Sequence, residues 1–214
     1  MVAVTRSAEV MRVLERYLVE VVERYELCPW ARAAREQGEL AVGVLWGEPA
    51  LDAWIAEGTR LLAGPATRVA MVVAPELAIA RGELGALRDA VAARMPAAGV
   101  AEFHPTAELD LSTPPRLVPF LRRSPDPMLQ LVPLAIIDAL RAGAPMPGLA
   151  QQASMLGGRA DPPRRDVATR IAEANHARVT RDPAAIAAAL DDIAADRRDA
   201  YARVGIRSAG PSRP

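Results

Sequence analysis

The feature that most constrains the fold is an alternation of strand-like and helix-like segments between residues 40 and 105. At its centre, TRVAMVVAP contains a continuous apolar run, which is typical of a strand buried on both faces. The predicted strands are residues 40–46, 67–75 and 99–105, and the predicted helices between them are residues 49–64 and 81–95. This β-α-β-α-β order predicts an α/β fold, with a small sheet of three or four strands and helical crossovers. A ferredoxin-like sheet with one unrecognised strand is the alternative.

The N-terminal segment is predicted to form an amphipathic helix. Its apolar side chains recur every three or four residues, at Val10, Val13, Leu14, Tyr17, Leu18, Val21, Val22 and Tyr25. This spacing places them on one face of a helix, and Ser7 is a suitable N-cap. A second short helix, residues 30–37, is predicted to follow and to end at Gly38.

The second half of the chain is predicted to begin with a proline-rich loop, residues 106–119, and to continue as helices. The helix over residues 122–143 is expected to begin at Ser124 or Asp126 and to kink at Pro133. The sequence therefore predicts four parts, an α/β domain (1–143), a flexible Pro/Gly-rich linker (144–163), a helical extension (164–207) and a disordered tail (208–214).

Composition excludes several classes of function. The chain has 26 basic and 26 acidic residues and a pI of about 6.8. It lacks the basic excess that is typical of nucleic-acid-binding proteins, so no nucleic-acid partner is predicted. All the basic residues are arginines, which excludes a P-loop lysine and a Schiff-base lysine. The N-terminus resembles no signal peptide, and no apolar run approaches the ~20 residues of a membrane helix. A cytoplasmic protein without a membrane partner is predicted.

Metal chemistry has little basis in the sequence. The chain holds two histidines and one cysteine, and their spacing matches no metal-binding pattern. A single cysteine also cannot form an internal disulfide. We therefore predict no metal site.

The one cysteine, Cys28, lies between the first helix and Pro29. Proline suits the first position of a helix, so Cys28 is predicted to be the N-cap of the second helix. There, free N–H groups and the helix dipole would lower the thiol pKa below its usual ~8.5, as in a nucleophile. The alternative is a small buried hydrophobic residue at a helix corner.

His104 ends the third predicted strand, immediately before Pro105. In α/β sheets, ligands bind beyond the carboxyl ends of the strands, so His104 is placed where a catalytic imidazole is expected. The alternative is a histidine bonded to a backbone carbonyl at the end of a strand.

The segment FLRRSPDP offers an anion site. Arg122 and Arg123 precede a predicted helix start at Ser124, where guanidinium groups and free N–H groups could converge on a carboxylate or phosphate. Asp126 competes for the same N–H groups. The alternative is a solvated arginine pair beside an ordinary cap.

These three segments, in this order, resemble an uncharacterised bacterial family, domain of unknown function 1415. Its pattern is L-C-P-F-A, then F-H-P, then N-R-S-P-x-P followed by a His-Leu-Leu-Arg run, and the resemblance covers roughly residues 12–142. The matching residues are Cys28, Pro29, His104, Pro105, Arg123, Ser124 and Pro125. The departures are Trp30 for Phe, Arg122 for Asn, and Gln130 and Pro133 for the His and Arg of the late run. The segment RIAEANHARV is similar to the family's late I-P-E-R-N-I segment. The resemblance implies a site without naming its reaction.

Three hypotheses follow. The first is a thiol-dependent hydrolase or transferase acting on a small anionic metabolite, with Cys28 as nucleophile, His104 as acid or base, and Arg123 with Ser124 as anion clamp. It predicts that these four residues line one pocket. The second is a haem or metal-binding module that uses Cys28-Pro29 and His104. The third is a non-catalytic interaction domain, with the Ala-rich C-terminal helices as the interface.

Overall fold

The computed structural model describes residues 5–141 and 167–207. Its elements are α1 (Arg6–Arg16), the π-helix η1 (Tyr17–Glu23), α2 (Ala31–Glu36), β1 (Leu40–Val44), α3 (Leu51–Leu62), β2 (Val69–Val73), α4 (Arg81–Arg94), β3 (Ala98–Phe103), α5 (Pro114–Leu121), β4 (Met128–Pro133), α6 (Leu134–Arg141), α8 (Val167–Arg181) and α9 (Pro183–Arg203). The predicted flexible linker and disordered tail lie outside the described residues.

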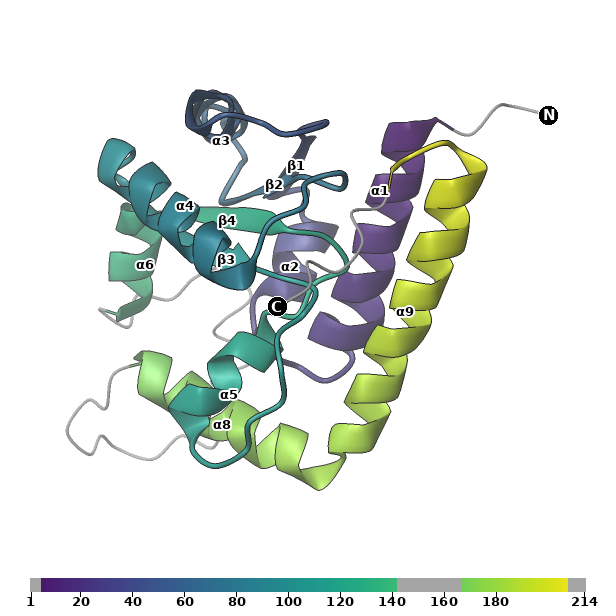
Figure 1. Cartoon of the computed structure of the whole chain (residues 1–214). Coiled ribbons are helices and arrows are strands. Elements are labelled where there is room, and N and C mark those ends of the chain that lie inside the picture. Colours follow the sequence, from purple (N-terminus) through teal and green to yellow (C-terminus); the bar gives the residue numbers. More distant parts are fainter. Residues whose placement is uncertain (1–4, 142–166, 208–214) are drawn as a thin grey trace.

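The sheet has four strands in the order β1-β2-β4-β3 (Figure 1). β1 and β2 are parallel, and β4 runs antiparallel to both β2 and β3. The predicted α/β fold with helical crossovers is confirmed, and the sheet has the larger of the two predicted numbers of strands, four. The adjacent parallel pair differs from the antiparallel ferredoxin-like alternative.

The fourth strand corrects one prediction. Residues 122–143 were expected to form a kinked helix, but Met128–Pro133 is the strand β4. Of the described residues in this range, only Leu134–Arg141 is helical. The Leu-rich segment favours a helix by propensity, yet it is buried between two strands that satisfy its backbone. Pro127 and Pro133 each disfavour helical geometry at the residue before them, which is a local signal for an extended segment.

The first helix is confirmed, with two differences. The Thr5 side chain accepts a hydrogen bond from the Ala8 N–H at 3.2 Å, so Thr5 rather than Ser7 is the N-cap. From Tyr17 to Glu23 the helix continues with the wider π-helical turn. After it, the Leu27 N–H donates a hydrogen bond to the Val22 carbonyl at 2.8 Å. Segments of π-helix are rare and are frequent at functional sites.

The predicted proline-rich loop contains the helix α5. Pro114 and Pro115 occupy its first turn, where a missing N–H costs no hydrogen bond. Proline at the start of a helix therefore explains why a segment predicted as a loop is partly helical.

Helices cover both faces of the sheet. The larger core cluster lies against α1, η1, α5, α8 and α9, whereas α3 and α4 pack on the opposite face around Trp54 and Leu84. α9 lies antiparallel beside α1 (Figure 1), and its Ile186, Leu190 and Ile193 belong to the larger core. The predicted C-terminal extension is helical within 167–207, and it shares this core with the α/β part.

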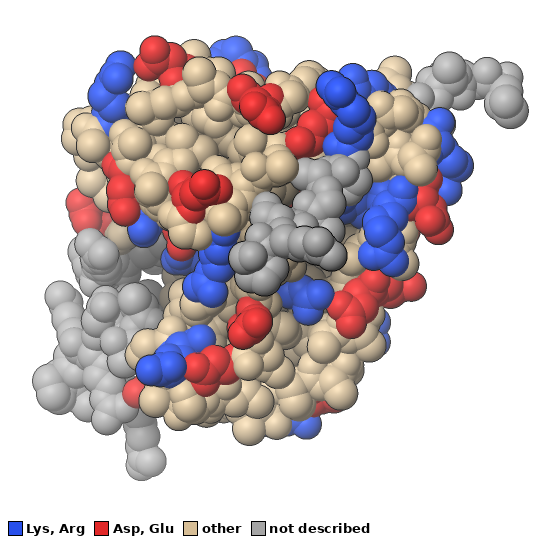
Figure 2. All heavy atoms as spheres, in the orientation of Figure 1, with Lys and Arg blue, Asp and Glu red and all other residues tan. Residues whose placement is uncertain are grey.

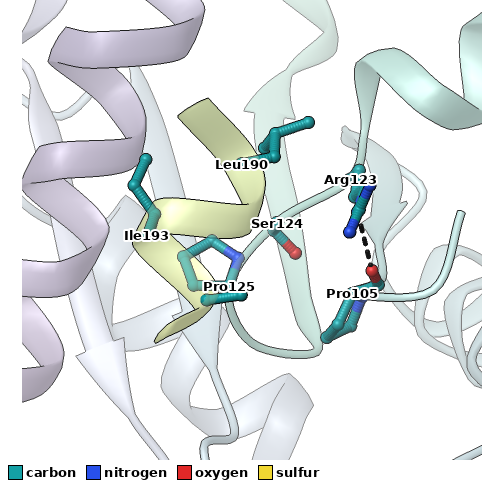
Figure 3. Close-up of a pocket in the computed structure, with 7 residues that line it drawn as sticks. Pro105, Arg123, Ser124, Pro125, Leu190 and Ile193 are labelled. Carbon is teal, nitrogen blue, oxygen red and sulfur yellow. Dashed lines mark hydrogen bonds between the residues drawn. The ribbon is translucent and has the colours of Figure 1, made fainter. Parts of the chain in front are cut away.

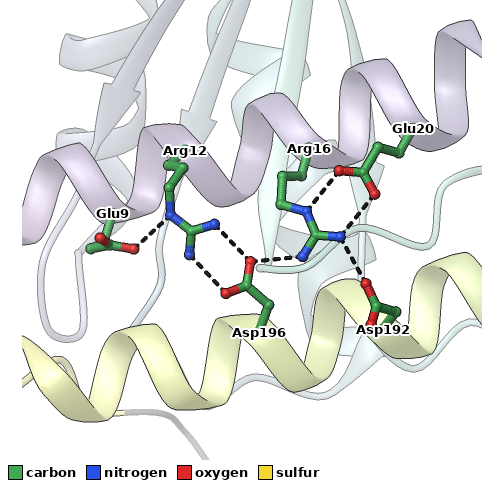
Figure 4. A network of polar contacts seen from close by, with 6 residues as sticks. All are labelled: Glu9, Arg12, Arg16, Glu20, Asp192 and Asp196. Atoms are coloured by element: carbon green, nitrogen blue, oxygen red, sulfur yellow. Dashed lines mark hydrogen bonds and ion pairs between the residues drawn. The ribbon is translucent and has the colours of Figure 1, made fainter.

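Ion pairs join α1 to α9 along the outside of this core (Figure 4). Asp196 accepts hydrogen bonds from Arg12 at 2.7 and 2.9 Å and from Arg16 at 2.8 Å. Arg16 also pairs with Glu20 and with Asp192, both at 2.7 Å. The two arginines lower the pKa of Asp196 to about 2, against the opposing effect of burial.

The surface carries charges of both signs. Figure 2 shows acidic and basic side chains interspersed over the face in view. Within the described residues, no helix combines the length and apolar character needed to cross a bilayer.

Candidate functional site

One rim of the sheet gathers the predicted site segments. Val44 pairs with Val73, and Met128 pairs with both Val73 and Phe103. The carboxyl ends of β1, β2 and β3 therefore lie level with the start of β4. His104 and the RRSPDP segment therefore lie at one rim, and the segment leads into a strand rather than the predicted helix.

Asp126 is buried at this rim and binds α9. Its carboxylate accepts hydrogen bonds from Arg197 Nε at 2.7 Å and from the Tyr201 hydroxyl at 2.6 Å. Burial raises the pKa of Asp126, and Arg197 and Tyr201 oppose the rise. Arg197 also donates to the Pro75 carbonyl at 3.0 Å. Both oxygens of Asp126 are therefore engaged in joining α9 to the sheet.

Arg123 and Ser124 line one small hollow together with Pro105 and three residues of α9 (Figure 3). The hollow has a volume of about 30 Å³, room for one or two water molecules. Arg123 donates to the Pro105 carbonyl at 3.2 Å and to Asp191 at 2.8 Å. The Ser124 hydroxyl donates to the Asp126 carbonyl at 2.5 Å. These contacts tie the loop after β3 to α9.

His104 uses both ring nitrogens within the protein. Nδ1 accepts a hydrogen bond from the Thr106 N–H at 3.2 Å, which assigns the proton to Nε2. Nε2 then donates to the Ile79 carbonyl at 2.9 Å, and the residue is 7% exposed. This is the environment of the alternative interpretation, a histidine bonded to backbone at the end of a strand.

Arg122 and His104 line a second hollow, of about 10 Å³, with Arg81 and Glu102. The Arg122 guanidinium lies 3.6 Å from Glu102 Oε2, and Arg88 lies at the same distance from that oxygen. These distances exceed those of charge-assisted hydrogen bonds. Burial lowers the pKa of Arg122, and Glu102 opposes this effect, but an arginine stays protonated.

Cys28 lies half-buried against the larger core, between η1 and α2. The helix α2 begins at Ala31 with Trp30 as its N-cap, which corrects the prediction that Cys28 caps it. Burial raises the pKa of the Cys28 thiol, and the backbone N–H groups of Trp30 and Ala31 oppose the rise without cancelling it. The expected lowering of the thiol pKa is therefore reversed.

Tyr17 is a buried residue with a polar hydroxyl that sequence analysis did not single out. It is 1% exposed, and its hydroxyl has no hydrogen-bond partner among the described residues. Burial raises the Tyr17 pKa, Cys28 raises it further, and Arg122 lowers it. Cys28 and Arg122 thus both lie within electrostatic range of one phenol. In the sequence, Tyr17 counts only as one apolar position of a helix, so no signal marked its hydroxyl.

The structure thus separates the predicted residues into groups. Arg123 and Ser124 share the larger hollow, His104 and Arg122 share the smaller one, and Cys28 lines neither of these two. Cys28 and Arg122 both affect the pKa of Tyr17. Among the side chains described, no group of three or more His, Cys, Asp or Glu is placed to hold a metal ion.

Comparison of the chain with protein-family models, with curated proteins and with solved structures finds no match.

Proposed function

We propose that the chain is a thiol-dependent enzyme acting on a small anionic molecule, bound at a site formed by Cys28, Tyr17 and Arg122. The observation that carries the proposal is the buried Tyr17 hydroxyl without a partner among the described residues. Leaving such a group unsatisfied costs roughly 1–3 kcal/mol. A ligand oxygen that accepts from the phenol would recover this free energy.

The electrostatics of the cluster favour an anion as that ligand. Arg122 acts on Tyr17 as a cation, and its only ion pair among the described residues, to Glu102, is long at 3.6 Å. A carboxylate or phosphate oxygen could therefore accept from Tyr17 and approach Arg122 at the same time. Such a ligand would lie beside the Cys28 thiol.

Each residue then has a distinct part in the proposed chemistry. Tyr17 and Arg122 orient the anionic group, and Cys28 is the nucleophile. The thiol must lose its proton first, because the thiolate is the reactive form. Both ring nitrogens of His104 are hydrogen-bonded within the protein. We therefore assign an oxygen of the bound anion as the acceptor of the Cys28 thiol proton.

In this proposal the other predicted residues hold the backbone of Arg122 in place. The His104 backbone N–H donates to the Arg122 carbonyl at 3.0 Å, and Arg123 holds the Pro105 carbonyl beside it. The Phe-His-Pro and Arg-Ser-Pro motifs would thus fix the backbone that carries Arg122. The haem hypothesis has no comparable support, because His104 lacks a free ring nitrogen.

Alkylation of Cys28, the one cysteine, tests the proposal with two probes of opposite character. Iodoacetate is an anion and iodoacetamide is its neutral counterpart. Relative to N-acetylcysteine, we expect the protein to favour iodoacetate by about fivefold, since a nearby cation contributes roughly 1 kcal/mol. Arg122→Gln should remove this preference, and Arg116→Gln, at an exposed arginine of α5, should retain it. Equal ratios in wild type and Arg122→Gln would refute the anion site.

A further inference from the structure

Two side chains of α8 hold the backbone directly before Cys28. The Asn175 amide Nδ2 donates to the Leu27 carbonyl at 2.8 Å. Arg178 donates to the Glu26 carbonyl at 3.0 Å and pairs with the Glu26 carboxylate at 2.8 Å. Both carbonyls of this short segment are therefore fixed from one helix that is distant in sequence.

The segment that they hold has an unfavourable conformation. Glu26 has a φ of +50°, the only positive φ at a non-glycine position within the described chain. A side chain disfavours this left-handed region, whereas glycine enters it freely. Contacts elsewhere must maintain such a backbone, and Arg178 contacts the strained residue through both its carbonyl and its carboxylate.

α8 has few fully buried side chains among those whose burial is described. Of its side chains whose burial is described, only Asn175 and Val179 are buried. The helix also packs against α5, and His176 Nε2 forms a hydrogen bond with the Leu111 carbonyl at 2.9 Å. The neighbouring α9 buries five apolar side chains and also Arg197. A helix with few buried apolar side chains can detach while the rest of the core stays folded.

Asn175 has a second unusual property. It is 3% exposed, yet its Oδ1 has no hydrogen-bond partner among the described residues. A buried amide with one unsatisfied end is costly. Its one bond to the Leu27 carbonyl therefore indicates a specific task at the Cys28 segment.

We propose that Asn175 and Arg178 are positioning residues for Cys28, and that detachment of α8 exposes the thiol. In the attached state, the two side chains hold Glu26 and Leu27 so that Cys28 stays half-buried beside Tyr17. In the detached state, Glu26 relaxes and the thiol becomes accessible. The proposal deepens the proposed function by adding control of access to the same site. The two proposals can be tested separately. Control of access predicts a change in the Cys28 alkylation rates with both iodoacetate and iodoacetamide, whereas the anion site predicts a change in the ratio of these two rates.

The test is the alkylation rate of Cys28 at fixed pH in the full chain. We expect Asn175→Ala to raise the rates with iodoacetamide and iodoacetate alike, by roughly five- to tenfold, from loss of a buried hydrogen bond. Arg178→Ala should raise both rates by about two- to fivefold. Arg181→Ala, at an exposed arginine near the end of α8, should leave both rates unchanged.

Urea unfolding of each variant separates local detachment from global unfolding. The proposal fails if Arg178→Ala leaves both rates unchanged, or if the rates rise only in proportion to the loss of global stability. Arg178 is partly exposed, so its replacement tests the proposal even where Asn175→Ala does not fold. In a Glu26→Gly background, where the left-handed backbone needs no clamp, Arg178→Ala should lose most of its effect. An undiminished effect there would also refute the proposal.

Discussion

Two clusters in this molecule combine the same kinds of group, a tyrosine, an arginine and an acidic side chain, with different outcomes. Around Asp126, Arg197 and the Tyr201 hydroxyl lie at hydrogen-bonding distance, 2.7 and 2.6 Å. Around Cys28, the Tyr17 hydroxyl has no partner among the described residues, and Arg122 reaches Glu102 only at 3.6 Å. The first cluster is complete and joins α9 to the sheet. The second leaves hydrogen-bonding capacity unused, which is why we place the ligand there.

The largest expected effect is that of breaking the complete cluster. Arg197→Ala should lower the free energy of unfolding by about 3–5 kcal/mol at neutral pH, because it leaves a buried charge at Asp126. The loss should shrink as pH falls, since burial raises the pKa of Asp126 and protonation removes the charge. Urea unfolding measures both effects, with Arg198→Ala on the exposed side of α9 as control.

The matching change in the cluster around Cys28 is Arg122→Ala, and it should lower the free energy of unfolding much less. Arg122→Ala loses one long ion pair, worth under about 1 kcal/mol. If Arg122→Ala destabilised the protein as strongly as Arg197→Ala, both clusters would stabilise the fold and the proposed difference between them would be wrong.

The second prediction concerns the tyrosine of the complete cluster. Tyr201→Phe removes the hydrogen bond to the Asp126 carboxylate and should cost about 1.5–3 kcal/mol in urea unfolding, as for bonds to charged groups. Tyr25→Phe, at a half-buried tyrosine near the end of the N-terminal helix, is the control for a hydroxyl not bound to a carboxylate. Equal costs for the two variants would contradict the role given to Tyr201.

The third prediction uses the exposed ion pairs between α1 and α9, which are complete but solvent-accessible. The folded pKa of Asp196, about 2, lies below its ordinary value of 3.8. Its contribution to stability is therefore fully present above about pH 4 and is lost as pH falls toward 2, up to about 2 kcal/mol. Asp196→Asn should remove this part of the acid dependence in urea unfolding, whereas Asp199→Asn should retain it. An unchanged acid dependence in Asp196→Asn would show that these pairs contribute nothing.

Sequence patterns predicted those parts of the fold that depend on periodicity. The apolar face of the first helix and the three strands of the β-α-β-α-β alternation were predicted, because each follows from local spacing. The strand β4 was missed because its burial between β2 and β3 overrides the helix propensity of its leucines. Only the restriction before Pro127 and Pro133 marked it locally.

The site was predicted less fully, for a different reason. The rim that holds His104 and Ser124 follows from strand direction, so it could be predicted. Whether a polar group is bonded or free depends on partners distant in sequence, such as Ile79 for His104 and Arg197 for Asp126. For the same reason, Tyr17 could not be distinguished from its apolar neighbours on the helix.

The smallest expected effect on stability is that of Tyr17→Phe, and it tests the comparison most directly. The hydroxyl has no partner to lose among the described residues, so we expect a change in unfolding free energy between zero and a gain of about 1 kcal/mol. The same variant should reduce the preference of Cys28 for iodoacetate over iodoacetamide, because the phenol would no longer donate to the bound anion. A structural tyrosine would show the reverse pattern, a loss of stability with an unchanged ratio. Since Tyr201→Phe is expected to show that loss, the two hydroxyl deletions together decide which cluster builds the fold and which one is left open for a ligand.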